Sequence, residues 1–383
     1  MQNKIKTIHK AGFVFFLSIG FAAYINSNFI SSFVGEKLTG IIFTLASVGS
    51  ILALLIAPKI FKKIGGYKFL ILIALLDALS FLGIALFKNT WAIIFVFIVG
   101  LSLNTLIAFS LDELLKIFSK NSNTGETRGV YLSLGNLAWI LCQLLIVIFL
   151  GNFSLQNVYF ASFISMLIFA IICFFNFKNI PEPTYDKIHS FKFIKTFFEH
   201  KNLKRAYGIS FLVYFFYVWM VIYTPIYLYA HLNFSWKEIG FMFMIMLIPF
   251  LFIPVKVGRY ADKIGERKML MFGFLITALS TFTLFFAEVH SFWLWTIILF
   301  LTRIGIAITE SMSDTYFFRH IKPENEEFIG VYRSASPIAN ILGPLAAFLV
   351  LLLTPSFNFL YIILSIFMLF GIYLASTIRK NEI

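Results

Sequence analysis

Apolar stretches of about 20 residues recur along almost the whole chain, and they decide what it can fold into. A helix of this length spans the hydrocarbon core of a bilayer. Twelve such stretches are separated by polar segments: 11–34, 39–58, 69–87, 91–111, 129–150, 156–177, 207–231, 238–257, 269–287, 292–316, 329–353 and 357–378. Because backbone polar groups in lipid must be paired within their own segment, each stretch is predicted to be helical. We therefore expect an all-α membrane protein with twelve transmembrane helices.

The composition excludes several other classes of protein. Hydrophobic residues make up 60% of the 383 residues and charged residues 13%. Soluble domains contain roughly 45–50% hydrophobic residues and about 25% charged residues. These values argue against a soluble enzyme, a disordered chain, a disulfide scaffold and a nucleic-acid-binding domain. The two cysteines, Cys142 and Cys173, lie in apolar stretches and have no metal-ligand spacing. The first apolar stretch is longer than the apolar region of a signal peptide, so we interpret it as the first span.

Basic residues are divided unevenly between the two sets of alternate loops. Of the 31 Lys and Arg residues, 26 lie at the termini and in every second loop, and three lie in the other loops. The remaining two, Arg303 and Arg333, lie within apolar stretches. Cytoplasmic loops carry the excess of basic residues in membrane proteins. The pattern predicts an even number of spans in the cytoplasmic membrane, with both termini in the cytoplasm.

The longest polar segment, 179–206, divides the twelve spans into six and six. We therefore predict an N-terminal six-helix bundle over 1–178, a cytoplasmic central loop over 179–206, and a C-terminal six-helix bundle over 207–383. Within the loop, residues 191–200 are compatible with a short amphipathic helix on the membrane surface. A solvated linker is the equally weighted alternative.

Short sequences repeat between the two halves at a nearly constant offset. Residues 63–68 read KIGGYK and residues 263–268 read KIGERK, an offset of 200. Residues 129–133 read GVYLS and residues 330–334 read GVYRS, an offset of 201. Two separated matches indicate two six-helix copies. Because both copies begin on the same side, they are predicted to be parallel repeats related by an axis along the membrane normal.

The loop after the eighth span reads GRYADKIGERK from Gly258 to Lys268. This resembles the signature cytoplasmic loop of the major facilitator superfamily, Gly-x-x-x-Asp-x-x-Gly-x-basic-basic. The first copy departs from the pattern, since Lys62 stands where the family has Asp, so the resemblance is to a diverged member. The resemblance implies a conformational latch between the halves, formed by Gly258, Asp262, Gly265, Arg267 and Lys268 with Gly65 and Arg128.

Three ionisable residues lie within the tenth span, where a charge costs about 2.5–3.5 kcal/mol to insert. At 100° per residue, Arg303, Glu310 and Asp314 fall on one face of a helix. The family resemblance implies that this helix lines the central cavity. We interpret Arg303 as a group that binds a polar or anionic substrate or tunes Glu310, which would carry a proton. The alternative is a network that holds the tenth and eleventh spans together, and it is the favoured one for Asp314.

Other polar residues inside the spans mark further candidates for substrate or proton binding. Asp77, at the centre of the third span, is either a proton site or a packing residue against the second span. Mid-span amides mark either pocket walls or helix–helix contacts: Asn26, Asn104, Asn136, Gln143 and Asn340. Tyr217 and Tyr223 in the seventh span either stack a ligand or pack in the core.

No nucleotide-binding loop or hydrolase motif occurs in the sequence. We therefore expect a secondary active transporter of a small solute that works by alternating access, not an enzyme, without cofactor or metal. Proton-coupled export of an amphipathic compound is the first hypothesis, import of a sugar or organic anion the second, and a non-transporting membrane protein of the same fold a remote third. The expected partners are the small-molecule substrate, the lipid bilayer and protons, with no nucleic acid, and the expected state is a monomer.

Overall fold

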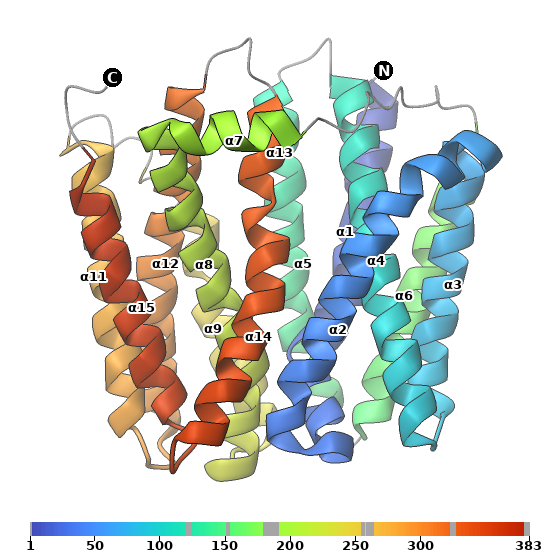
Figure 1. Ribbon diagram of the computed structural model, residues 1–383. Coiled ribbons are helices and arrows are strands. Elements are labelled where there is room, and N and C mark those ends of the chain that lie inside the picture. The colour runs from blue at the N-terminus through green and yellow to red at the C-terminus, as the bar shows by residue number, and fades with distance from the viewer. Residues whose placement is uncertain are drawn as a thin grey trace. The chain divides into compact units, whose positions relative to one another are not determined.

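The computed structural model describes residues 2–119, 124–150, 154–178, 191–253, 257, 264–321 and 327–378. Every regular element in these ranges is a helix (Figure 1). Eleven stretches are long and apolar enough to cross a membrane. The first, Lys4–Ala57, has 54 residues and would measure about 80 Å as one straight helix, against a hydrocarbon core of about 30 Å. It therefore holds two spans, and the predicted all-α fold with twelve transmembrane helices is confirmed.

The chain forms two compact units, Met1–Asp186 and Lys187–Ile383. The helices of the first unit are α1 (Gln2–Ala23), α2 (Asn26–Ile64), α3 (Gly66–Leu86), α4 (Thr90–Ser119), α5 (Thr124–Leu150) and α6 (Leu155–Asn176). Those of the second are α7 (Phe191–Glu199), α8 (Lys201–Ile226), the π-helical turn η1 (Tyr227–His231), α9 (Trp236–Leu247), α11 (Glu266–Phe286), α12 (Phe292–His320), α13 (Glu327–Arg333), α14 (Ala335–Leu353) and α15 (Phe359–Ser376).

The two units use the same packing pattern. In the first, α3 packs against α4 and α6, and α1 packs against α5 and α6. In the second, α11 packs against α12 and α15, and α8 packs against α14 and α15. Gly65 and Gly265 immediately precede α3 and α11 and have nearly the same backbone angles, φ 81° and ψ 148° against φ 88° and ψ 147°. Since positive φ strains residues with a Cβ atom, the two glycines make the same turn, as the internal repeat predicts.

The first two spans are joined by a single glycine. Gly35, with φ 79° and ψ 162°, interrupts the helical residues of α2. The first span consists of α1 and the part of α2 before this glycine, with a turn at Tyr24 and Ile25 between them. The second span is the rest of α2. Because only glycine adopts such angles readily, Gly35 replaces the longer loop that usually separates two spans.

A close backbone contact holds α11 against α12. A Cβ atom added at Gly305 would lie 2.6 Å from the backbone nitrogen of Thr277 and 2.7 Å from the carbonyl oxygen of Gly273. Gly273 and Thr277 are one helical turn apart on α11, as are Gly305 and Thr309 on α12. Small residues at this spacing let membrane helices approach closely. The contact holds α12 against α11 at Gly305, two residues after Arg303.

We predict that Gly305→Ala destabilises the protein by about 1–3 kcal/mol, because the added methyl group overpacks the contact between α11 and α12. Thermal unfolding of the purified protein measures the effect. Gly330→Ala is the matched control, since a Cβ atom at that helical position meets nothing within 4 Å. Equal melting temperatures for the two variants would contradict the close contact.

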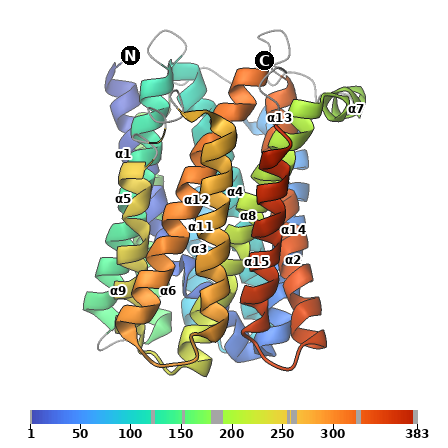
Figure 2. The same cartoon turned by 90° about the vertical axis from the view of Figure 1, so that its left-hand side faces the viewer.

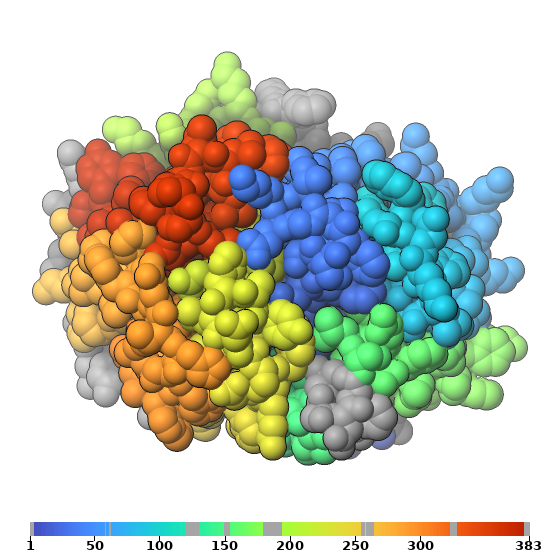
Figure 3. Space-filling view, turned by 90° about the horizontal axis from the view of Figure 1, so that it is seen from below, coloured from blue at the N-terminus to red at the C-terminus, as the bar shows by residue number. Residues whose placement is uncertain are grey.

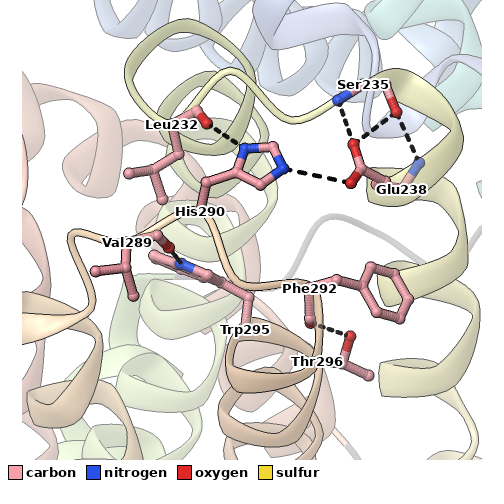
Figure 4. Close-up of polar contacts among 8 residues, drawn as sticks. All are labelled: Leu232, Ser235, Glu238, Val289, His290, Phe292, Trp295 and Thr296. Atoms are coloured by element: carbon pink, nitrogen blue, oxygen red, sulfur yellow. Dashed lines mark hydrogen bonds and ion pairs between the residues drawn. The ribbon is translucent and has the colours of Figure 1, made fainter.

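Polar contacts tie two loops together at one end of the second unit (Figure 4). The Nδ1 atom of His290 lies 2.8 Å from the carbonyl oxygen of Leu232, and its Nε2 atom lies 3.4 Å from Oε1 of Glu238. Ser235 and Glu238 form a capping box at the start of α9. Figure 3 views this end, where the yellow and orange surfaces of the two loops lie side by side. The contacts fix the start of α9 relative to the loop that precedes α12.

We predict that Ser235→Ala lowers the free energy of unfolding by about 1 kcal/mol, because the backbone N–H of Glu238 loses its side-chain acceptor. Ser235→Thr retains a hydroxyl and should stay close to wild type. Chemical or thermal unfolding in detergent distinguishes the two. If both variants unfold like the wild type, the capping box makes no contribution to stability.

The central polar segment contains a helix. Residues 191–199 form α7, so of the two alternatives for 191–200 the structure has the helix. Phe197 is fully buried, and its ring centroid lies 5.6 Å from that of Phe328 and 6.2 Å from that of Tyr207. α8 begins at Lys201, six residues before the predicted seventh span, because the helix continues into the polar segment.

Candidate functional site

Arg303 lies in α12 and is 1% exposed. Its guanidinium carbon lies 5.6 Å from the ring centroid of Phe216 and 5.9 Å from that of Tyr217, both in α8. Aromatic ring faces attract a cation at such distances, more strongly when water is excluded. Two rings of the seventh span therefore hold the charged group of the tenth span in place.

The rings stabilise the charge of Arg303, but they leave hydrogen-bonding capacity unused. Its Nε atom is buried and has no hydrogen-bond partner in the described parts of the chain. Across those same residues, no carboxylate lies within ion-pair distance of the guanidinium group. A buried N–H without an acceptor costs free energy. The guanidinium group can therefore bind an acceptor, such as a carboxylate or carbonyl oxygen.

Glu310, two helical turns further along α12, is bound by the same tyrosine. The hydroxyl of Tyr217 donates a hydrogen bond of 2.7 Å to Oε2 of Glu310. The ring of Tyr217 also lies near those of Tyr214 and Phe250, with centroid distances of 6.4 and 6.1 Å. Tyr217 thus contacts Arg303 with its ring face and Glu310 with its hydroxyl. The structure brings together these three of the residues predicted from the sequence.

Asp314 has a different set of partners. Its Oδ1 atom accepts a hydrogen bond of 2.9 Å from the hydroxyl of Tyr332 in α13, and that hydroxyl lies 3.0 Å from Oγ of Ser313. The ring of Tyr332 stacks on Phe317, with centroids 4.0 Å apart. This arrangement corresponds to the alternative in which Asp314 links the tenth and eleventh spans.

Asp77 is fully buried in α3 and accepts a hydrogen bond of 3.1 Å from Oγ of Ser80. A Cβ atom at Gly100 in α4 would lie 3.7 Å from Oδ1 of Asp77 and 2.7 Å from Oγ of Ser80. Asp77 therefore packs against the fourth span, whereas the packing alternative from the sequence had named the second span. At the repeat offset of 200, Asp77 corresponds to Thr277, which takes part in the contact between α11 and α12.

The predicted mid-span amides of the first unit differ in their surroundings. Asn26 accepts a hydrogen bond of 2.8 Å from the hydroxyl of Tyr159 in α6. Oδ1 of Asn104 and Nε2 of Gln143 are buried and have no hydrogen-bond partner in the described ranges. Asn136 is exposed. Asn104 and Gln143 are thus the two that have unused hydrogen-bonding capacity inside the bundle.

The predicted polar residues of α8 and α14 are used in packing. The hydroxyl of Tyr223 donates to the carbonyl oxygen of Pro344 at 3.3 Å, beside a 2.7 Å bond from Nε1 of Trp219 to the carbonyl oxygen of Gly343. Nδ2 of Asn340 donates to a carbonyl oxygen of its own helix. Tyr223 therefore follows the core-packing alternative.

The predicted latch lies only partly within the described residues. Gly258, Asp262 and the side chain of Arg128 lie outside them, so contact between Asp262 and Arg128 stays a prediction. Gly65 and Gly265 form the turns described above, and Arg267 and Lys268 are exposed. An ion pair joins the adjacent residue Glu266 to Arg319, with Nε and Oε1 3.1 Å apart. It connects the start of α11 to the end of α12.

Two residues of this region were missed by the sequence analysis. Phe216 carries the ring nearest to Arg303, yet one phenylalanine among 50 has no distinguishing signal. Tyr332, the partner of Asp314, did have a signal, because it belongs to the repeated GVYRS sequence and corresponds to Tyr131. The internal repeat could therefore have identified Tyr332.

We predict that Tyr217 and Glu310 are energetically coupled by about 1 kcal/mol, as expected for a hydrogen bond inside a membrane protein. The free energies of unfolding of Tyr217→Phe, Glu310→Met and the double variant measure this coupling, because Met has no acceptor oxygen. In the wild-type background, Tyr217→Phe leaves the carboxyl oxygen without its donor. In the Glu310→Met background, where no acceptor is present, the same change should cost less. Strictly additive effects would contradict the hydrogen bond.

The family follows from comparison with known proteins. The sequence matches the family model described as Major Facilitator Superfamily over residues 11–256 and 206–382. The chain belongs to this superfamily and is a membrane transporter, not an enzyme. A search of the curated proteins finds no match.

Solved structures of the same fold cover nearly the whole chain. The nucleoside transporter NupG has a TM-score of 0.76 at 11% identity and covers 99% of this chain and 100% of its own. The xylose transporter XylE from E. coli has a TM-score of 0.72 at 13% identity, covering 99% of both chains. The human organic anion transporter MFSD10 has a TM-score of 0.66 at 15% identity, covering 98% and 99%. At these identities the likeness shows the fold alone.

Proposed function

We propose that the protein is a secondary active transporter that moves a small organic solute by alternating access and couples its movement to protons through Glu310. The observation that carries this proposal is the position of Tyr217 between Arg303 and Glu310. A cation and a carboxyl group inside the bilayer are costly to maintain and usually mark a functional site. Family membership supplies the general activity, and this cluster supplies the substrate and proton site.

The coupling follows from the two contacts of Tyr217. Its hydroxyl binds the carboxyl group of Glu310, and its ring face binds the guanidinium group of Arg303. A substrate that displaces the ring from Arg303 also disturbs the hydrogen bond to Glu310. Protonation of Glu310 changes the same hydrogen bond, because the carboxyl group is its acceptor. Differential binding of this kind is what links two ligands thermodynamically.

The surroundings of the cluster favour a substrate with both a ring and a polar group. Aromatic rings lie on one side of it, those of Phe216, Tyr217 and Tyr214, and the unpaired Nε atom of Arg303 supplies a hydrogen-bond donor. An amphipathic compound matches both features. Export of such a compound remains our first hypothesis.

An organic anion is the second candidate, and one observation favours it. Within the described residues Arg303 has no carboxylate partner, so a substrate carboxylate can complete the ion pair. Among the proteins of the same fold, one is named an organic anion transporter and another a xylose transporter. Import of an organic anion or a sugar is therefore kept as the alternative.

The remaining parts of the mechanism are proposals of the same standing. The units 1–178 and 207–383, joined by the cytoplasmic segment 179–206, would rock about the substrate site in a monomer with both termini in the cytoplasm. The loop from Gly258 to Lys268 would stabilise one conformation of the transport cycle by binding the other half. Two of the buried groups that lack hydrogen-bond partners, Oδ1 of Asn104 and Nε2 of Gln143, would face the substrate path.

Flux measurements in proteoliposomes test the proposal. A thermal-shift screen with nucleosides, sugars, organic anions and amphipathic cations first identifies a ligand. We predict that a pH gradient then drives its flux through the wild type, and that Glu310→Gln loses at least about tenfold of this flux while retaining solute exchange without a gradient. Glu199→Gln, an exposed carboxyl on α7, is the control and should transport normally.

Three outcomes discriminate between the hypotheses. Unchanged gradient-driven flux in Glu310→Gln would remove Glu310 from the coupling. A ligand whose binding is lost in Arg303→Gln, and which carries a carboxylate, would favour the organic anion. The direction of flux under an imposed gradient separates export from import, and absence of flux for every ligand that binds would refute active transport.

A further inference from the structure

Among the described side chains of α7, the apolar ones are only partly covered by the protein. Positions 194, 197 and 198 fall on an arc of about 100° of the helix. Phe197, at one edge, is fully buried against Phe328, Tyr207 and Phe317. Ile194 is 42% exposed and Phe198 37% exposed. An amphipathic helix with an open apolar edge is incompletely packed in its own unit.

The position of α7 places this open edge at the level of the membrane surface. Within the second unit, α7 packs against α8 and α13 and crosses the end of the bundle (Figure 1). Seen from the side, it projects beyond α13 and α14 (Figure 2). The helix that contains the seventh span, α8, begins at Lys201, directly after α7 and His200, and its first turn is polar. A helix at the end of a membrane span and across it lies in the interfacial region.

The charges around the open edge are mostly positive. Lys195 on α7, and Lys201 and Lys204 on the first turn of α8, are exposed. Residues 178–206 contain seven basic residues and three acidic ones. Each Lys or Arg near an anionic lipid surface strengthens binding by roughly fivefold. The combination of exposed apolar side chains and lysines is typical of helices that bind such surfaces.

We propose that α7 is a binding element for anionic phospholipid. Ile194 and Phe198 enter the acyl-chain boundary, and Lys195 and Lys201 bind lipid phosphates. Phe197 transmits the position of α7 to Phe328, and α13 continues from Phe328 to Tyr332, the partner of Asp314. The lipid surface thereby positions the end of α13 that contacts α12.

Site-specific fluorescence on the full-length protein tests this. Ile194→Cys and Glu199→Cys are labelled with an environment-sensitive dye and reconstituted in nanodiscs of phosphatidylcholine, with or without phosphatidylglycerol. The native thiols of Cys142 and Cys173 are fully buried, so the labelled wild type gives the background. Quenching by nitroxide lipids labelled near the headgroup reports insertion, and quenching by iodide reports exposure to water.

The dye at position 194 should be quenched by the nitroxide lipid and protected from iodide, and phosphatidylglycerol should strengthen both effects. The dye at position 199, on the polar face of the same helix, should remain open to iodide. Lys195→Glu with Lys201→Glu should abolish the effect of phosphatidylglycerol at position 194 without lowering the melting temperature in detergent.

Two results would overturn the proposal. Equal iodide quenching at positions 194 and 199 would show that α7 does not insert. Insertion that is the same with and without phosphatidylglycerol would remove the anionic headgroup as the partner. Soluble glycerol phosphate added to phosphatidylcholine nanodiscs should not change the quenching at position 194. If it reproduces the effect of phosphatidylglycerol on quenching, the ligand is a free phosphate instead of a membrane surface.

Discussion

Hydrocarbon offers no hydrogen-bond partner, so a polar side chain inside this bundle must find its partner within the protein, on its own helix or on another one. Tyrosine supplies it repeatedly, through the pairs Tyr217 with Glu310, Tyr332 with Asp314, and Tyr159 with Asn26. A phenol is mostly apolar and carries one hydroxyl, so it packs among the aliphatic side chains and still satisfies an oxygen. The groups that tyrosine does not satisfy stand out against this background, above all the Nε atom of Arg303. These groups are candidates for binding a substrate or a proton.

Duplication provides an internal comparison within one chain. Gly65 and Gly265 keep one turn in both copies, because the backbone geometry there excludes other residues. The same correspondence matches Asp77 with Thr277, both at a closely packed contact between neighbouring helices of their own unit. A carboxyl group in one copy thus occupies the place of a hydroxyl in the other. This comparison shows that position 77 lies at a helix contact, while Oδ2 of Asp77 is buried without a hydrogen-bond partner in the described residues.

The spans, their grouping and the repeat were predictable from the sequence, because lipid leaves helices as the solution for each apolar stretch. The partners of the polar residues were not. In membrane spans, where most positions are apolar, periodicity does not distinguish a side facing lipid from a side facing protein. Hence the face shared by Arg303 and Glu310 was predictable, whereas Phe216 as a neighbour of Arg303 was not. The choice between a helix and a linker at α7 likewise depended on Phe197 having aromatic neighbours far away in sequence.

The turn at Gly35 has a mechanical consequence. With one residue between them, the first two spans have no slack in which to slide along each other. Any displacement of the first span along its axis is therefore transmitted to the end of the second span next to Gly35. The two spans are therefore expected to move together as one hairpin.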